Sequence, residues 1–259
     1  MMGLVGRRLV IIATAAWLPV LLVTWWWFAS ADSQDPFFPP LSVIWEQFKF
    51  NWVFEQVPIH VVPSLRNLFS GLFLGAAIGL IGGAYLGTSR TAAKYFEPAI
   101  DFLRSIPPVA TVPIFIVIFG LDATMRIAAI TFSAMFPVLL ATIQGVRATD
   151  PTLMDTAKAM RLTKSQILWR VRMPSAGPTI FAGLQLALQF AFVVTIASEL
   201  LGSGFGLGAF TLIATQSFMI IDAWTGVILL GLLGYVLNLS FDGIERWVLR
   251  WYYNQKKIA

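Results

Sequence analysis

The sequence predicts an all-α polytopic membrane protein with about six transmembrane helices and with both termini in the cytoplasm. Of its 259 residues, 58% are apolar and 12% are charged, and the mean hydropathy is +0.77. Soluble domains contain about 45–50% apolar and about 25% charged residues, so this chain has too little charge to cover a water-facing surface. At about 20 residues per crossing, its length accommodates roughly five to seven helices joined by short loops.

Composition also excludes several functions. The chain has no cysteine, which removes disulfides, thiolate metal sites and cysteine catalysis. Its single histidine, His60, cannot form a zinc site of the H-E-x-x-H type, and we expect it at a surface or interface. No lysine follows a glycine, so a phosphate-binding loop for ATP is absent. We therefore predict no catalytic residue, no metal site and no cofactor bound by this chain, and no nucleic-acid partner despite the net charge of +5.

The amino-terminal part contains the first predicted crossing and an external segment. An apolar stretch over residues 9–29 follows Arg7 and Arg8 and ends in the aromatic run 25–28, which is typical of an uncleaved helix that enters from the cytoplasm. Residues 30–63 are polar and proline-rich, with an amphipathic helix predicted over 41–56. The predicted division is a first transmembrane helix (1–30), an external segment (31–63) and a core (64–259).

The second predicted crossing, residues 64–86, carries glycine at every fourth position. The glycines are Gly71, Gly75, Gly79, Gly83 and Gly87. In lipid, small residues on one face let two helix backbones approach closely. The stripe therefore predicts tight helix packing, either inside one subunit or against a second copy of the chain.

Four further crossings are predicted over residues 105–121, 127–146, 180–198 and 223–240. The first of them follows a polar link at 90–104 and contains Pro107, Pro108 and Pro113. Prolines at this density end or kink a helix. Irregular backbone at membrane depth occurs only where protein or a water-filled cavity covers it.

Residues 203–221 are apolar but rich in glycine, and charge distribution decides how they are placed. A seventh crossing would put four basic residues outside: Arg246, Arg250, Lys256 and Lys257. With six crossings, all but three of the 18 basic residues face the cytoplasm, the exceptions being Lys49, Arg66 and Arg126. Because cytoplasmic loops are enriched in basic residues, six crossings are favoured. Segment 203–221 is then re-entrant or interfacial on the outer side.

Residues 147–174 form the longest cytoplasmic loop. Asp150-Pro151 predicts a helix start, and the pattern that follows predicts two short amphipathic helices that end at Pro174. Six basic residues lie in or beside this loop: Arg147, Lys158, Arg161, Lys164, Arg170 and Arg172. From the pattern alone, the loop either docks a partner or merely fixes the topology.

This loop resembles the signature cytoplasmic loop of bacterial ABC-importer permeases. That pattern runs Glu-Ala-Ala, three residues, Gly, about a dozen residues and Leu-Pro, and here Asp155-Thr156-Ala157, Arg161 and Met173-Pro174 occupy these places. The resemblance implies coupling helices that sit in a groove of an ATPase subunit. The implied coupling residues are Asp155, Thr156, Ala157, Met160, Arg161, Leu162 and Pro174. Arginine does not easily adopt the positive φ of the family glycine, so we expect a differently built turn at Arg161.

Further motifs follow in family order at residues 104–113, 119–120, 136–137, 142–147, 198–202, 206–208 and 245–251. Over roughly residues 35–251 the chain is similar to the nitrate/sulfonate/taurine/bicarbonate branch of these permeases. The resemblance implies a type I ABC importer permease fold in the bacterial plasma (inner) membrane. It implies a homodimer, two cytoplasmic ATPase subunits that hold ATP and Mg²⁺, and an external solute-binding protein that delivers a small anion.

The candidate residues of the pathway or gate are Arg104, Pro107, Pro108, Glu199, Gly202, Gly206 and Gly208. Glu199, at the outer end of a crossing, is expected to gate or to be structural, because a lone carboxylate repels an anion. Arg104 either anchors its helix end at headgroup level or assists anion release at the cytoplasmic mouth. Asp155 either docks the ATPase or stabilises the start of its helix.

Two other classes of function remain as alternatives. A secondary transporter would need no ATPase and usually shows inverted repeats, of which the sequence gives no convincing sign. An intramembrane enzyme would need paired ionisable residues within its crossings, and these are almost absent. Relatives of the branch also carry aromatic acids and vitamin precursors, so the sequence leaves the substrate open.

Overall fold

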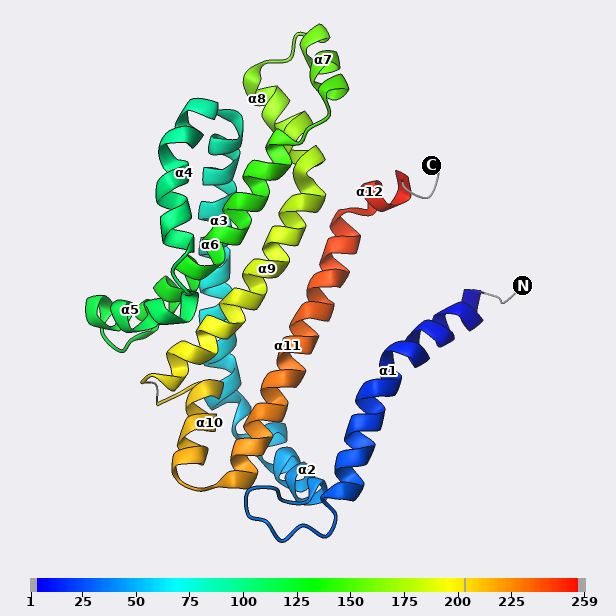
Figure 1. Cartoon of the computed structure of the whole chain (residues 1–259), viewed down its shortest axis with the longest axis vertical. Coiled ribbons are helices and arrows are strands. Elements are labelled where there is room, and N and C mark those ends of the chain that lie inside the picture. Colours follow the sequence, from blue (N-terminus) through cyan, green and yellow to red (C-terminus); the bar gives the residue numbers. More distant parts are fainter. Residues whose placement is uncertain (1–3, 203, 256–259) are drawn as a thin grey trace. The chain divides into compact units, whose positions relative to one another are not determined.

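The computed structural model describes residues 4–202 and 204–255, which form helices and their connections (Figure 1). Helix α1 spans Leu4–Ala29 and α2 spans Leu41–Phe50, and π-helical turns at Asn51–Glu55 and Val57–Val61 lead to α3. Helices thus occur in both predicted places, but α2 ends before residue 56, and the crossing of the membrane by α1 stays a prediction. Lys256 and Lys257, which the topology places in the cytoplasm, lie outside the described residues.

Internal contacts divide the chain into two units, and the smaller comprises residues up to Val57 with Thr211–Ile228. In this unit, Gln47 and Asn51 donate side-chain hydrogen bonds to Oδ1 of Asp222 at 2.8 and 2.7 Å. The indole N–H of Trp224 donates to the carbonyl of Phe37 at 3.1 Å. These bonds fix the external segment to the start of α11 (Ile220–Val248).

The larger unit comprises Pro58–Phe210 and the chain from Leu229 onward, and three long helices form its core. Helices α3 (Val62–Thr88), α6 (Ala123–Arg147) and α9 (Met173–Leu200) lie side by side (Figure 1). Apolar side chains at their contacts are fully buried, among them Leu68, Met125, Ile130, Val138 and Val194.

The glycine stripe of α3 packs against α6 within this unit. A Cβ atom added to any stripe glycine would collide with α6, and at Gly79 it would lie 2.6 Å from the carbonyl oxygen of Met135. The α6 residues that meet the stripe also recur every four positions: Ile130, Ala134, Val138, Thr142 and Val146. The structure therefore supports the first of the two readings, close packing inside one subunit.

Two predictions are wrong here: residues 105–121 do not form one continuous crossing, and residues 90–104 are not a polar link without helical structure. Residues 90–104 form a helix, α4 (Arg90–Arg104), whose first turn is capped because Ser89 Oγ accepts the N–H of Ala92. A sharp turn then leads to a 3₁₀ turn (Pro108–Thr111) and α5 (Val112–Phe119), and the two halves are bent by 88°. The prolines end α4, as expected, because they lack the N–H that continues a helix.

Among the described residues, four helical segments are long and apolar enough to cross a membrane: Val57–Thr88, Ala123–Arg147, Lys164–Leu200 and Ile220–Val248. The bent pair is either a broken fifth span or a re-entrant loop. Helix α10 (Leu207–Gln216) has 10 residues and is about 15 Å long, half of a hydrocarbon core of about 30 Å. It is too short for a seventh crossing, and the total of six stays a prediction.

Candidate functional site

The predicted coupling loop begins with α7 (Pro151–Ala159). Oδ1 of Asp150 accepts the N–H of Thr152 at 2.7 Å and Pro151 is the first helical residue, which confirms the predicted helix start. Asp155 therefore lies inside the helix, and stabilising its start falls to Asp150. The Asp155 side chain is 74% exposed and pairs with Lys158 on the same helix, at 2.8 Å, so it faces solvent.

In the turn after α7, Arg161 adopts the left-handed conformation that the family glycine would adopt. Our expectation of a different turn is therefore wrong. Arg161 has a φ of 52°. Its N–H donates to the carbonyl of Lys158 at 2.9 Å, and the N–H of Leu162 donates to the carbonyl of Ala157 at 3.1 Å. These are the two bonds of a Schellman motif. They offset the cost of the left-handed conformation, which is roughly 1–2 kcal/mol for residues other than glycine, and Arg161 is exposed to solvent.

The second predicted coupling helix does not end at Pro174. Helix α8 (Lys164–Ile167) starts at a capping box of Thr163 and Gln166 and continues through the π turn Leu168–Arg172 into α9. The result is one continuous helix over Lys164–Leu200. Pro174 has no backbone N–H and cannot donate a helical hydrogen bond. The π turn just before it shifts the hydrogen-bonding pattern by one residue, and the helix continues through the proline.

The structure brings most of the predicted coupling residues to one cavity of about 460 Å³. The coupling residues in its lining are Thr156, Ala157, Met160, Leu162 and Pro174. Trp251 and Tyr252 of α12 (Arg250–Gln255) complete it, and sequence reasoning missed their part in this face. Their sequence signals were the aromatic run after the last crossing and, for Trp251, the motif at 245–251. Met160 is 68% exposed, so this face of the unit is open and partly apolar.

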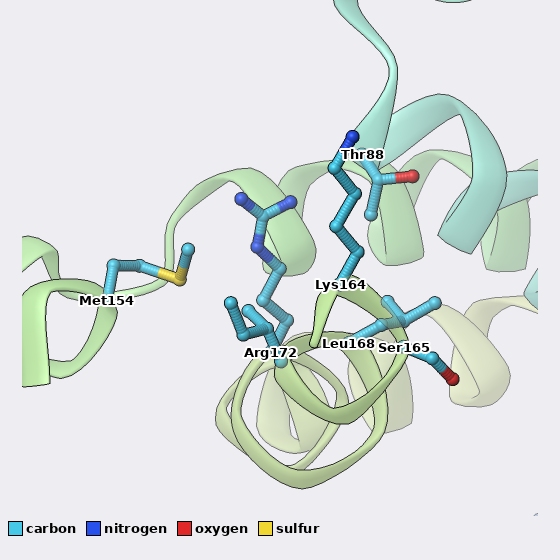
Figure 2. A pocket seen from close by; sticks show the side chains of 7 residues that line it. Thr88, Met154, Lys164, Ser165, Leu168 and Arg172 are labelled. Atoms are coloured by element: carbon cyan, nitrogen blue, oxygen red, sulfur yellow. The ribbon is translucent and has the colours of Figure 1, made fainter. Parts of the chain in front are cut away.

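A second cavity of about 490 Å³ lies between α7 and the end of α3 (Figure 2). Lys164 and Arg172 extend from the α8–α9 helix toward Thr88, and Met154 lies on the α7 side. The Nε atom of Arg172 is buried and has no hydrogen-bond partner among the described residues. The underside of the coupling loop is therefore electropositive and suits acidic groups.

At the opposite end of α9, Glu199 is 1% exposed and joins several elements. Ser64 Oγ donates to its Oε1 at 2.6 Å, and the N–H of Gly208 donates to its Oε2 at 2.9 Å. A Cβ atom added to Gly206, whose φ is 109°, would collide with the Glu199 carboxylate. Glu199 thus lies at the end of α9, where the sequence placed it, and the loop at 206–208 folds over its side chain and encloses it.

His60 belongs to the same cluster and is buried, which corrects the expected surface position. Its Nδ1 lies 3.0 Å from the carbonyl oxygen of Gly206, and its ring packs edge-on against Phe210. The N–H of Leu207 donates to Ser64 Oγ at 3.0 Å. The cluster thus ties residues 206–208, with Gly206 and Gly208, to the start of α3, whereas Gly202 lies at the exposed end of α9 beside Leu121.

Arg104 lies deeper than expected. Helix α4 carries the chain about 22 Å from the end of α3 before Arg104, so this residue is not at the cytoplasmic mouth. It lines a groove with Pro108, with Phe136 from the middle of α6 and with Phe190 from the middle of α9. Pro107 precedes the 3₁₀ turn and is exposed. Whether Arg104 anchors the end of α4 or assists the release of an anion stays a prediction.

Comparison with known proteins identifies the family to which this chain belongs. Residues 71–252 match the family described as binding-protein-dependent transport system inner membrane component. The chain is 34% identical to a bicarbonate transport system permease protein of Synechococcus elongatus, covering 73% of this chain and 68% of the relative. It is 26% identical to the taurine transport system permease protein of Escherichia coli, covering 91% and 88%.

Solved structures show the same fold. The methionine ABC transporter MetNI in inward-facing conformations matches with a TM-score of 0.65 at 23% identity, covering 73% of this chain and 94% of that one. Members of the family span the inner membrane several times, and they work with an ATPase subunit and a solute-binding protein. ATP hydrolysis belongs to that separate subunit, so this chain is a transport subunit and not an enzyme. The chain belongs to the family of binding-protein-dependent transport system inner membrane components, the permease subunits of ABC importers.

Proposed function

We propose that this permease imports a small anion, delivered by an external solute-binding protein and driven by two ATPase subunits that dock on residues 147–174. In this proposal the permease is a homodimer, and ATP and Mg²⁺ are held by the ATPases. The observation that carries it is the continuous helix Lys164–Leu200, which is about 55 Å long. It begins in the coupling loop and ends at the buried Glu199 cluster.

This helix supplies a direct mechanical route between the two ends of the permease. Closure of the ATPases on bound nucleotide displaces α7, and α7 meets the start of the long helix around the cavity of Met160 and Pro174. Because a helix resists bending and its core contacts are close-packed, a displacement at one end is transmitted to the other. Nucleotide then drives the change by binding the two conformations with different affinity.

The proposed docking surface has a charge pattern and an apolar centre. Asp155 projects outward from α7, Met160 is exposed after it, and Lys164 and Arg172 line the cavity beneath. Exposed apolar side chains with flanking charges are typical of a surface that is covered in a complex. Arg161, at the turn, presents its guanidinium beside this surface.

The substrate class is inferred from the relatives and from charge. Bicarbonate and taurine, named for the two relatives, both carry an anionic group. The groove of this chain has one cationic side chain, Arg104, among its lining residues. An anion is therefore the substrate that fits both observations, and aromatic acids fall in the same class.

The experiment is ATP hydrolysis by the purified complex of permease and ATPase. We expect Asp155→Ala and Met160→Asp to insert normally but to lower permease-dependent hydrolysis about tenfold, because each alters the docking surface. Asp32→Ala, an exposed carboxylate in the external segment, is the matched control and is expected to keep full activity. Full hydrolysis by both loop variants would overturn the proposed docking site, and transport by the purified chain alone would overturn the function.

A further inference from the structure

The groove beside Arg104 lies at the middle of the larger unit. Its lining includes Phe132 and Phe136, near the centre of α6 (Ala123–Arg147), and Leu186 and Phe190, near the centre of α9 (Met173–Leu200). Both helices are long and apolar enough to cross a membrane. Arg104 therefore lies level with the middle of two crossings, far from either headgroup region.

A charged side chain at this depth needs water or a partner. Arg104 Nε donates to Oδ1 of Asp101 at 2.8 Å, yet both side chains remain at least half exposed, at 50% and 60%. Ionisable residues at membrane depth face a water-filled cavity or the interior of a bundle. The 88° break just after Arg104 supports the same conclusion, because irregular backbone at this depth is tolerated only beside protein or water.

The guanidinium retains donors that could hold a ligand. The bond to Asp101 uses Nε, and the two terminal nitrogens make no hydrogen bond within the described part of the chain. Terminal guanidinium nitrogens match the oxygens of carboxylate and sulfonate groups. The groove has a volume of about 310 Å³, at the small end of the roughly 300–1,000 Å³ of ligand pockets.

Opposite the charge, the wall of the groove is apolar and partly aromatic. The rings of Phe132 and Phe136 pack edge-on with centroids 5.1 Å apart, and Phe115 of α5 lies 5.8 Å from Phe132. Besides Arg104, the one polar side chain in the lining is Ser133, whose hydroxyl donates to the carbonyl of Ile130 at 2.8 Å. An inorganic oxyanion here would lose hydration on the faces turned away from Arg104, whereas an apolar tail would gain contacts.

We propose that this groove is the membrane-embedded substrate site and that it selects organic anions with an apolar part, such as alkanesulfonates, over inorganic oxyanions. The anionic group binds the terminal nitrogens of Arg104, and the apolar part lies against Phe132, Phe136 and Phe190. The inference rests on the proposed import of an anion and names the class of anion.

Because the chain has no cysteine, a single introduced thiol reports on this site in the assembled permease–ATPase complex. Leu186→Cys places a thiol at a groove residue that is 51% exposed, and Leu121→Cys, 57% exposed between α5 and α6, is the control. The rate of modification by a charged water-soluble thiol reagent is measured with and without butanesulfonate, methanesulfonate or nitrate. The solute-binding protein is left out, so its own specificity does not enter.

We expect butanesulfonate to protect the thiol of Leu186→Cys but not that of Leu121→Cys. Methanesulfonate should protect the groove thiol more weakly, by about fourfold for each methylene removed. Arg104→Gln should raise the half-protective butanesulfonate concentration about tenfold, Arg104→Lys should raise it less, and Lys94→Gln on the same helix should leave it unchanged.

Three results would each overturn the proposal. They are an unreactive thiol in the groove variant, protection unaffected by Arg104→Gln, and nitrate as effective as butanesulfonate. The effect of Asp155→Ala on ATP hydrolysis is measured on the same complex. A complex that passes this test but shows no protection in the groove contradicts the substrate site alone and leaves the proposed coupling intact.

Discussion

Ser64 Oγ lies 2.6 Å from Oε1 of Glu199, which joins the start of α3 to the end of α9 across 135 positions of sequence. Both side chains are buried, at 2% and 1% exposure. Residues 206–208 close over this pair through backbone bonds to Ser64 and Glu199. The pair therefore holds together the end of the permease that lies opposite the coupling loop.

Breaking this pair should destabilise the protein in a non-additive way. Glu199→Gln leaves one acceptor oxygen where the carboxylate has two, and Ser64→Ala removes the hydroxyl that bonds to both Leu207 and Glu199. We expect each single change to lower the free energy of unfolding by about 1–3 kcal/mol. In thermal unfolding in detergent, the double variant should lose clearly less than the sum of the two losses. Strict additivity would show that the two side chains do not act together.

The glycine stripe predicts a sharp difference between two glycines. Gly79→Ala places a methyl group against the backbone of α6, and we expect a loss of about 1–3 kcal/mol because both helices must separate. Gly231→Ala in α11, where a Cβ atom meets nothing within 4 Å, should be neutral or stabilise by up to about 1 kcal/mol. Thermal stability measured by size-exclusion of heated samples tests both. Equal stability of the two variants would contradict the packing of α3 on α6.

The turn at Arg161 predicts a stabilising substitution. Arg161→Gly removes the cost of a positive φ and should stabilise the coupling loop by about 1 kcal/mol. Arg161→Ala, which removes the charge but keeps the strain, is the control and should not stabilise. Hydrogen exchange of the α7 amides measures this directly. Faster exchange in Arg161→Gly than in the wild-type protein would refute the prediction.

The two carboxylates of α7 should separate stability from coupling. Asp150→Ala removes the cap on Thr152 and should cost about 1 kcal/mol of local stability, seen as faster proteolysis of the loop. Asp155→Ala, whose side chain is largely exposed, should leave proteolysis unchanged while lowering ATP hydrolysis by the complex. If the two variants behaved alike in both assays, the distinct roles given to the two residues would be wrong.

The sequence predicts helices well where apolar length alone decides, as in α3, α6, α9 and α11. It misplaces α4, because a helix with charges at Arg90, Lys94, Glu97, Asp101 and Arg104 looks like a loop to a search for apolar spans. The prolines after α4 correctly predict the break in the helix. They do not predict the direction in which the chain continues, which the structure shows as a bend of 88°. The position of Arg104 beside the groove therefore could not be predicted from the sequence.

In the candidate site, too, local sequence signals predict some features and miss those that depend on tertiary contacts. Motif spacing predicts the coupling residues, whose role stays a prediction, and Asp150-Pro151 correctly gives the start of α7, since these signals are local. The burial of His60 and Glu199 depends on Ser64 and Gly206, which are distant in sequence, and no periodic pattern predicts that pairing. Likewise, Trp251 reaches the cavity of Met160 through tertiary packing alone.

Cross-linking of Met160→Cys to the ATPase subunit in the assembled importer tests the central claim most directly. With no cysteine elsewhere in the chain, any cross-link from the permease reports on this position. The account predicts an efficient cross-link from position 160 whose yield changes when ATP binds, and none from Leu121→Cys, an exposed residue between α5 and α6. An active importer in which position 160 forms no cross-link, or in which position 121 cross-links equally well, would contradict it.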